Sequence, residues 1–186
     1  MRHEEIVFAG FGGQGVLFAG QLLAYAGIAE GLYVTWIPSY GPEMRGGTAN
    51  CTVILSEEEI GAPVVRHPSV AVVMNGPSMD KYEPLVRPGG LLLVNRSLVP
   101  RQCAREDIRA LYLDASDIAT ELGNVRMANM VLLGALVAVT GIVSLETLEA
   151  QLEEHLSARQ RKWLEPNKLA LARGAELVSV APAPEG

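Results

Sequence analysis

The stretch Phe8-Ala9-Gly10-Phe11-Gly12-Gly13-Gln14-Gly15-Val16-Leu17 joins an apolar strand to an apolar helix through a glycine-rich turn. Residues 6–9 are short and hydrophobic on both faces, which is typical of a strand with layers packed above and below it. From Val16 to Glu30 apolar residues recur with a helical period, and Gly31 stands where such a helix would end. We therefore expect a strand–turn–helix unit at the start of an α/β fold.

The glycines of this turn predict an anion site. Gly10, Gly12 and Gly15 fit the pattern G-x-G-x-x-G, which permits a sharp turn and a close approach of a ligand to the backbone. The N–H groups and the positive dipole end of the following helix favour a negative charge, by about 0.3–1 kcal/mol for each exposed contact. The turn thus predicts a phosphate or carboxylate without identifying it. A tight turn with no ligand is the alternative.

The second strand argues against a dinucleotide. In dinucleotide enzymes an acidic residue at the end of that strand holds a ribose hydroxyl. Here the strand expected at residues 33–37 is followed by Pro38-Ser39-Tyr40, and the first carboxylate beyond it is Glu43. This absence disfavours NAD and FAD.

Composition indicates one globular domain over residues 1–186, with a frayed tail at about 181–186. Apolar residues make up 49% of the chain and charged residues 19%, and the net charge is −6. With no Lys/Arg-rich run, we expect no nucleic-acid partner. Cys51 and Cys103 lie far apart without a C-x-x-C pattern, which excludes a zinc ribbon or a cysteine-ligated cluster within the chain and fits a reducing cytoplasm. Glu4 and Glu5 directly before the first strand predict no signal peptide.

Residues 127–145 carry no charge, at the lower edge of a membrane-spanning length. The segment contains Asn129, Thr140, Ser144 and two glycines, and no aromatic belt. We therefore expect a helix buried within the protein or at a subunit interface, and no membrane partner.

The link between the second and third strands predicts a mixed sheet. The strand expected at 48–55 follows the one at 33–37 after a short link with no helical pattern, whereas a parallel crossover needs a dozen or more residues. The third strand should therefore be antiparallel. Further strands are expected at 70–74, 91–95 and 110–113, and helices at 78–86 (with Ser78 as N-cap), 116–122, 127–140, 144–156 and 166–178. The fold class is α/β, a three-layer α/β/α arrangement with a mixed, mostly parallel sheet and a Rossmann-like first βα unit.

Ligands of such sheets bind beyond the carboxyl ends of the parallel strands. This edge gathers the glycine turn, Ser39, Tyr40, Asn75 and Asn95-Arg96-Ser97, with Arg45 as its best-placed cation. Arg45 beside Gly46 can clamp a phosphate, or it can pair with Glu43 or a partner subunit.

Several of these residues have two interpretations. Gln14 either donates to a ligand or satisfies the backbone of the turn, and Ser39 and Asn75 are either ligand contacts or turn formers. Tyr40 and Trp36 fit packing or interface roles better than ring stacking. The edge has no nucleophile–base pair, no paired acids and no metal-ligand cluster. By itself the chain is expected to bind an anionic ligand and not to be a complete catalyst.

Two motifs at this spacing carry a family resemblance. The first is Gly10-Phe11-Gly12-Gly13-Gln14-Gly15-Val16, and the second runs from Ser39-Tyr40-Gly41-Pro42-Glu43-Met44-Arg45 through Gly46-Gly47 to Thr48-Ala49. Together they resemble the gamma subunit of the 2-oxoacid:ferredoxin oxidoreductases. Arg87-Pro88-Gly89-Gly90, Ala128-Asn129-Met130 and Pro166-Asn167-Lys168 also match, so the resemblance covers roughly residues 5–177.

The resemblance implies a subunit of an enzyme that converts a 2-oxoacid and coenzyme A to acyl-CoA and carbon dioxide while reducing ferredoxin. It implies alpha, beta and ferredoxin-like delta subunits as partners, which hold thiamine diphosphate, Mg and iron–sulfur clusters. Coenzyme A is then a substrate at or near this subunit. The residues expected to bind it or to shape the adjoining interface are Gly10, Gly12, Gly13, Gln14, Gly15, Ser39, Tyr40, Arg45, Gly46 and Asn75. No catalytic or metal-binding residue is expected in the chain.

Within the family, Tyr40-Gly41-Pro42-Glu43-Met44-Arg45 resembles the 2-oxoglutarate and branched-chain 2-oxoacid enzymes, and we expect the 2-oxoglutarate type. Two other hypotheses stand beside this one: a free-standing nucleotide-binding module, and an architectural subunit whose glycine turn is empty. The apolar composition also allows a homodimer when the chain is isolated.

Overall fold

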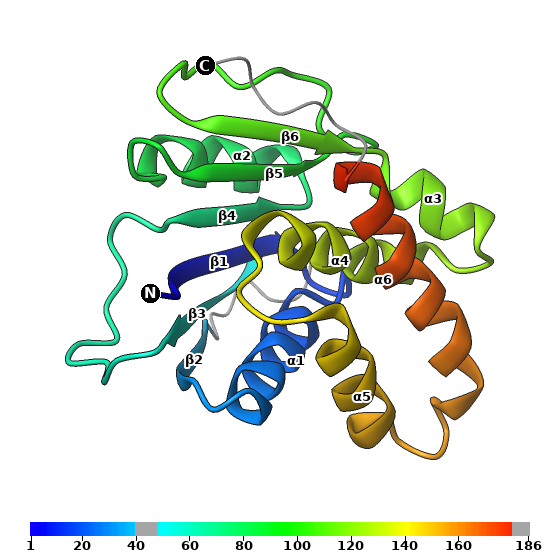
Figure 1. Cartoon of the computed structure of the whole chain (residues 1–186). Helices are drawn as coiled ribbons and strands as arrows, with labels where there is room; N and C mark the ends of the chain where they lie inside the picture. Colours follow the sequence, from blue (N-terminus) through cyan, green and yellow to red (C-terminus); the bar gives the residue numbers. More distant parts are fainter. Residues whose placement is uncertain (40–47, 180–186) are drawn as a thin grey trace.

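A computed structural model describes residues 1–39 and 48–179 of the chain. Its centre is a six-stranded sheet in the order β2-β3-β1-β4-β5-β6 (Figure 1). The strands are β1 (His3–Phe11), β2 (Tyr33–Ser39), β3 (Thr48–Ser56), β4 (Val70–Val73), β5 (Leu91–Asn95) and β6 (Arg109–Leu113). β1, β4, β5 and β6 pair in parallel, whereas β3 is antiparallel to both β1 and β2. The predicted mixed sheet is confirmed.

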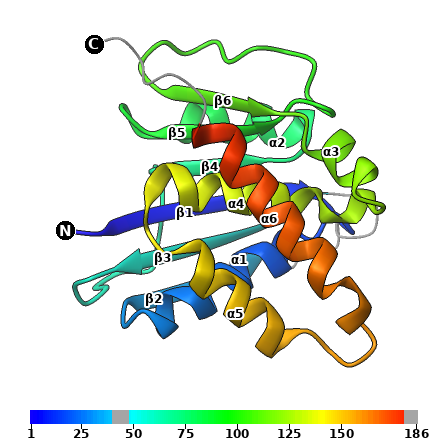
Figure 2. The ribbon, with the colours of Figure 1, turned by 45° about the vertical axis from the view of Figure 1, so that its right-hand side comes forward.

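The helices form the layers on either side of this sheet. They are α1 (Val16–Ala29), α2 (Gly76–Tyr82), α3 (Ala115–Glu121), α4 (Ala128–Thr140), α5 (Leu145–His155) and α6 (Leu164–Ser179), with short 3-10 turns η2 (Glu83–Leu85), η3 (Val125–Met127) and η4 (Arg161–Trp163). α1, α4, α5 and α6 gather on one face, and α2 lies on the other (Figures 1 and 2). The expected three-layer architecture is confirmed, with a thick helical layer and a thin one.

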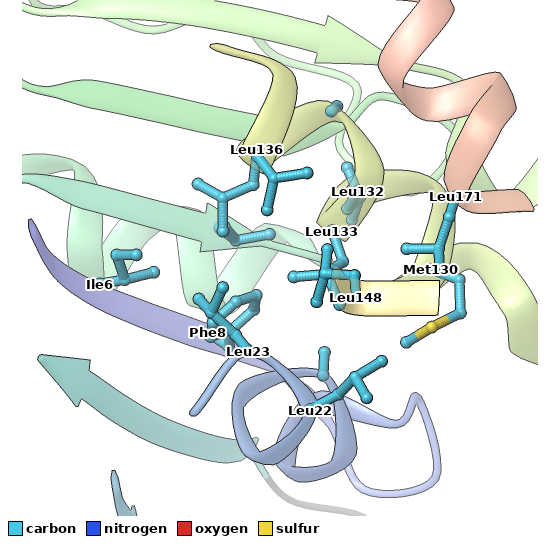
Figure 3. Packing of buried hydrophobic residues seen from close by; sticks show 14 of the residues in the cluster. Ile6, Phe8, Leu22, Leu23, Met130, Leu132, Leu133, Leu136, Leu148 and Leu171 are labelled. Carbon is cyan, nitrogen blue, oxygen red and sulfur yellow. The ribbon is translucent and has the colours of Figure 1, made fainter. Parts of the chain in front are cut away.

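The larger core lies under the thick layer. Ile6 and Phe8 of β1 point toward Leu22 and Leu23 of α1 and toward the apolar face of α4 (Figure 3). The alternate residues of β1, such as Val7 and Ala9, face the smaller core beneath α2. Since β1 is buried on both faces, its continuous apolar sequence is explained by its central position.

α4 is the buried helix expected from residues 127–140. Its residues from Ala128 to Val137 are all buried, and Gly141 ends it with a positive φ of 64°. Within the described residues, no helix has both the length and the apolarity needed to cross a membrane.

Several expected boundaries differ from the structure, among them those of β1, which runs from His3 to Phe11 and not only over residues 6–9. α2 begins at Gly76 and not at Ser78, because the Asn75 side chain accepts the Ser78 N–H at 2.9 Å and is itself the N-cap. α6 begins two residues before the proline at which we expected it to start, and β2 continues to Ser39. The loop that carries Tyr40, Arg45 and Gly46, and the expected tail at 181–186, lie outside the described residues.

Candidate functional site

The glycine turn connects β1 to α1 at the carboxyl end of the sheet. Gly13 and Gly15 have positive φ values of 90° and 71°, which only glycine adopts easily. Gly10 is needed for a different reason: a Cβ there would lie 2.9 Å from the Val16 side chain and 3.1 Å from the Met74 side chain. The predicted strand–turn–helix unit is therefore confirmed, with each of these glycines required by its geometry.

The mouth of the turn presents backbone donors. Among the described residues, no acceptor bonds to the N–H groups of Gly12, Gly13, Gly15 or the first turn of α1 (residues 16–18). Gly12 and Gly13 are exposed, and apart from its chain neighbours no atom of the described residues lies within 4 Å of where a Gly13 Cβ would stand. Open amides at a helix N-terminus suit a phosphate or carboxylate.

The Gln14 side chain serves the turn itself. Its Oε1 accepts the N–H of Phe11 at 2.6 Å, and its backbone N–H donates to the Phe11 carbonyl at 3.2 Å. Of the two interpretations of Gln14, the structure thus gives its amide oxygen the backbone role.

Asn75 lies beside the turn on the neighbouring strand. The Met74 N–H donates to the Ala9 carbonyl at 2.9 Å, which places Asn75 next to the end of β1. Its side chain is 1% exposed, with Oδ1 capping α2 and Nδ2 bonded to no described group. Asn75 is therefore a helix cap that keeps one spare donor near the glycine turn.

Ser39 is farther from the turn. It pairs with Asn50 of β3, which pairs with Ala9 of β1. Two strand spacings, about 10 Å, therefore separate Ser39 from β1 at the same edge of the sheet. The structure brings together Gly10, Gly12, Gly13, Gln14, Gly15 and Asn75, and leaves Ser39 at the margin.

The other polar residues at this edge hold the fold together. Asn95 is fully buried, and its Nδ2 donates to Ser116 Oγ at 2.9 Å and to the Met74 carbonyl at 3.3 Å. Arg96 forms an ion pair with Asp114. These bonds fix the ends of β4 and β5 and the start of α3.

Asn129 is a contact of the turn that sequence reasoning did not select for the site. Its Nδ2 donates to the Gly15 carbonyl at 3.0 Å, across 114 residues of sequence. A Cβ on Gly15 would lie 2.3 Å from that nitrogen. The signal in the sequence was the Ala128-Asn129-Met130 motif, whose role only the tertiary contact reveals.

The described residues include neither a cysteine with a lowered pKa nor a cluster of metal-binding side chains. Burial raises the pKa of the Cys51 thiol to about 12, and burial also raises the pKa of Cys103. No group of three or more His, Cys, Asp or Glu side chains is placed to hold a metal within the described ranges. The arrangement can bind an anion through backbone donors.

A family model described as pyruvate ferredoxin/flavodoxin oxidoreductase matches residues 5–177. The chain belongs to this family. It is 43% identical over 145 residues to the ketoisovalerate oxidoreductase subunit VorA of Methanothermobacter marburgensis, covering 78% of this chain and 30% of that relative. It is 36% identical over 182 residues to the 2-oxoglutarate synthase subunit KorC of Methanothermobacter thermautotrophicus, covering 94% and 95%. The chain thus spans about a third of the VorA relative and nearly all of KorC.

Solved structures agree with the family. The gamma subunit of keto/oxoacid ferredoxin oxidoreductase from Geobacter sulfurreducens superposes with a TM-score of 0.83 at 32% identity, covering 96% of this chain and 99% of that one. A 2-oxoglutarate:ferredoxin oxidoreductase from Magnetococcus marinus, described with 2-oxoglutarate, coenzyme A and succinyl-CoA bound, gives 0.88 at 25% identity, covering 98% and 32%. The family's gamma-type fold is therefore that of this chain.

Proposed function

We propose that the chain is the gamma subunit of a multi-subunit 2-oxoacid:ferredoxin oxidoreductase and serves its coenzyme A side. The complex would convert a 2-oxoacid and coenzyme A to acyl-CoA and carbon dioxide and pass the electrons to ferredoxin. Family membership over residues 5–177 and the names of the KorC and Geobacter relatives support this assignment.

The observation that carries the coenzyme A role is the set of open amides at the glycine turn. Coenzyme A brings phosphates, and these N–H groups have no described acceptor within the protein. A Cβ at Gly13 would have no other described atom within 4 Å, which supports an open space beside these amides. Arg45 and Gly46, with Tyr40, are proposed to complete the site from the neighbouring loop, with Ser39 at its margin.

Partners supply the remaining chemistry in this proposal. Alpha and beta subunits and a ferredoxin-like delta subunit would hold thiamine diphosphate, Mg and the iron–sulfur clusters, which carry out decarboxylation and electron transfer. The chain's own contribution is to bind and orient coenzyme A. Its two free cysteines fit a reducing cytoplasm as the location.

For the 2-oxoacid we propose 2-oxoglutarate, because the 2-oxoglutarate synthase relative is matched along 95% of its length. A branched-chain 2-oxoacid is the competing substrate, favoured by the 43% identity to VorA. Turnover of the assembled complex with 2-oxoglutarate and with ketoisovalerate, compared as kcat/KM, decides between them.

The coenzyme A role is tested with a matched pair at Gly13. Asp and Asn are similar in size and tolerate a positive φ better than other side chains, but only Asp adds a negative charge at the amides. In the assembled complex we expect Gly13→Asp to raise the KM for coenzyme A about fivefold or more over Gly13→Asn, since like charges a few ångströms apart repel by about 1 kcal/mol even in water. Equal KM values for the two variants would overturn the coenzyme A role and favour an architectural subunit.

A further inference from the structure

A polar hollow lies beside the glycine turn, on the side of the sheet that carries the thick helical layer. It has a volume of about 250 Å³, and its walls include Phe18 of α1, Asn124 and Arg126 at η3, and Gln160, Trp163 and Asn167 around η4 and α6. Asn129 also borders it and bonds to the Gly15 carbonyl. The hollow and the glycine turn thus share a side chain, while none of the described residues proposed above for coenzyme A lines the hollow.

One cation lines this hollow and three more are next in sequence to residues that line it, although the chain as a whole carries −6. Arg126 lines it, and Arg159, Arg161 and Lys162 flank Gln160 and Trp163 in sequence. All four cations are exposed, and none has an ion-pair partner in the described part of the chain. Elsewhere Arg2, Arg96, Arg101 and Arg105 are each paired with a carboxylate, whereas Arg66, Arg87 and Arg109 are exposed and also have no ion-pair partner among the described residues. The Arg126 guanidinium, which lines the hollow without an ion-pair partner, is therefore available to a phosphorylated ligand.

The same wall offers an aromatic ring and spare amide groups. Trp163 is half-buried, with Lys162 Nζ 5.6 Å from its ring centroid. Asn124 accepts the Arg126 N–H with its Oδ1, and Asn167 donates its Nδ2 to the Trp163 carbonyl. This leaves the Asn124 Nδ2 as a donor and the Asn167 Oδ1 as an acceptor, since neither bonds to another described group. An aromatic ring with one donor and one acceptor suits the face and edge of a base.

We propose that this hollow binds a purine nucleotide group, with the base against Trp163 and a phosphate at Arg126, which lines the hollow; Arg161, next to the lining residue Gln160, is proposed to reach the phosphates from outside it. The hollow is large enough for part of a ligand and not for a whole one, because pockets that enclose a drug-sized molecule measure about 300–1,000 Å³. The nucleotide comes either free or as the nucleotide end of coenzyme A. In the second case the inference rests on the function proposed above and extends the coenzyme A site from the turn to the hollow.

The test is calorimetric titration of the full chain at low and high salt with adenosine diphosphate, coenzyme A, pantetheine and inorganic pyrophosphate. We expect both adenine-containing ligands to bind, pyrophosphate to bind more weakly and pantetheine not to bind. A free-nucleotide site binds adenosine diphosphate at least as tightly as coenzyme A, whereas a coenzyme A subsite prefers coenzyme A. Pyrophosphate binding as tight as that of adenosine diphosphate overturns the nucleotide assignment, as does failure of both adenine ligands to bind at millimolar concentration.

The residues are tested with Arg126→Gln and Arg161→Gln, against Arg66→Gln as the control. Arg66 is also exposed and unpaired among the described residues, and its loop between β3 and β4 lies on the opposite side of the molecule from η4 (Figure 2). Loss of a charge-assisted hydrogen bond should weaken nucleotide binding about tenfold in each test variant and leave the control unchanged. If the two test variants keep the wild-type affinity while Gly13→Asp alone raises the KM for coenzyme A, this inference fails and the proposed function stands.

Discussion

At the residue scale, the glycine turn shows which features of a site can be predicted from the sequence and which cannot. Its shape follows from local requirements, because the positive φ values at Gly13 and Gly15 and the close approach at Gly10 arise within a few residues of chain. The role of Gln14 was left open, since whether its amide turns inward depends on the geometry of the turn. Asn129 reaches the turn from another helix, and no local pattern predicts that contact.

Glu83 is another residue whose role appears only in the fold. Its carboxylate is buried in η2 and accepts the Ala104 N–H at 2.6 Å, with Arg101 Nη1 2.6 Å from its Oε2. These bonds tie the loop before β6 to the thin helical layer. Burial pushes the pKa of Glu83 upward, but the Ala104 N–H and the Arg101 guanidinium outweigh burial, so the pKa lies below its ordinary value.

Glu83→Gln should therefore lower the free energy of unfolding in a pH-dependent way. The folded-state pKa is depressed, so the carboxylate stabilises the protein above its unfolded pKa and loses that contribution as the pH falls through the folded pKa. We expect a difference of about 1.5–3 kcal/mol at neutral pH, the usual contribution of a hydrogen bond to a charged group. Urea unfolding of both proteins from neutral to acidic pH measures it. A difference that grows on acidification would contradict the argument.

At the scale of elements, the direction of β3 was predictable because the length of the connection between two strands limits how they can pair. The link between β2 and β3 is too short for a parallel crossover, and β3 is indeed antiparallel to both of its neighbours. The starts of α2 and α6 were missed by two residues, because Asn75 and Ser78 both suit an N-cap and a proline is tolerated throughout a first turn.

The crossing of α4 and α6 was not predictable, since it depends on glycines facing one another across two separate helices. A Cβ on Gly134 would lie 1.9 Å from the Leu171 carbonyl oxygen, and a Cβ on Gly174 would lie 1.8 Å from the Val131 carbonyl oxygen. The two backbones are therefore in direct contact, and neither carbonyl can move as a flexible side chain could.

Gly134→Ala should destabilise the protein by about 1–3 kcal/mol or more, although alanine favours a helix, because the crossing must open. Gly61→Ala is the control: among the residues that the structure describes, its Cβ would meet no atom within 4 Å, and its φ is outside the left-handed region. Thermal and urea unfolding of the two variants measure the contrast. A stabilised Gly134→Ala would mean that helix propensity outweighs the contact and that the crossing is looser than the structure shows.

At the scale of the molecule, the two halves of the chain are joined at both ends of α1. At its start, Asn129 bonds to the Gly15 carbonyl. At its end, Glu30 accepts the Ser144 N–H at 2.7 Å and pairs with Arg2, which also bonds to Glu57. The first βα unit, which carries the open amides, is thus held by residues from the C-terminal half, and its geometry depends on the whole domain.

Asn129→Ala tests this dependence. Asn129 is 6% exposed, and its side chain makes two hydrogen bonds: Nδ2 donates to the Gly15 carbonyl, and Oδ1 accepts the Met130 N–H. The Gly15 carbonyl keeps the Ala19 N–H as its other donor, so we expect the loss of the two bonds to lower the free energy of unfolding by about 1–3 kcal/mol. Asn167→Ala is the matched control, because the Asn167 amide bonds only four residues back, to the Trp163 carbonyl, and should cost at most about 1 kcal/mol. Urea unfolding compares the two variants. Equal losses of stability would show that the bond between the halves is worth no more than a local one, and that the first βα unit holds its shape by itself.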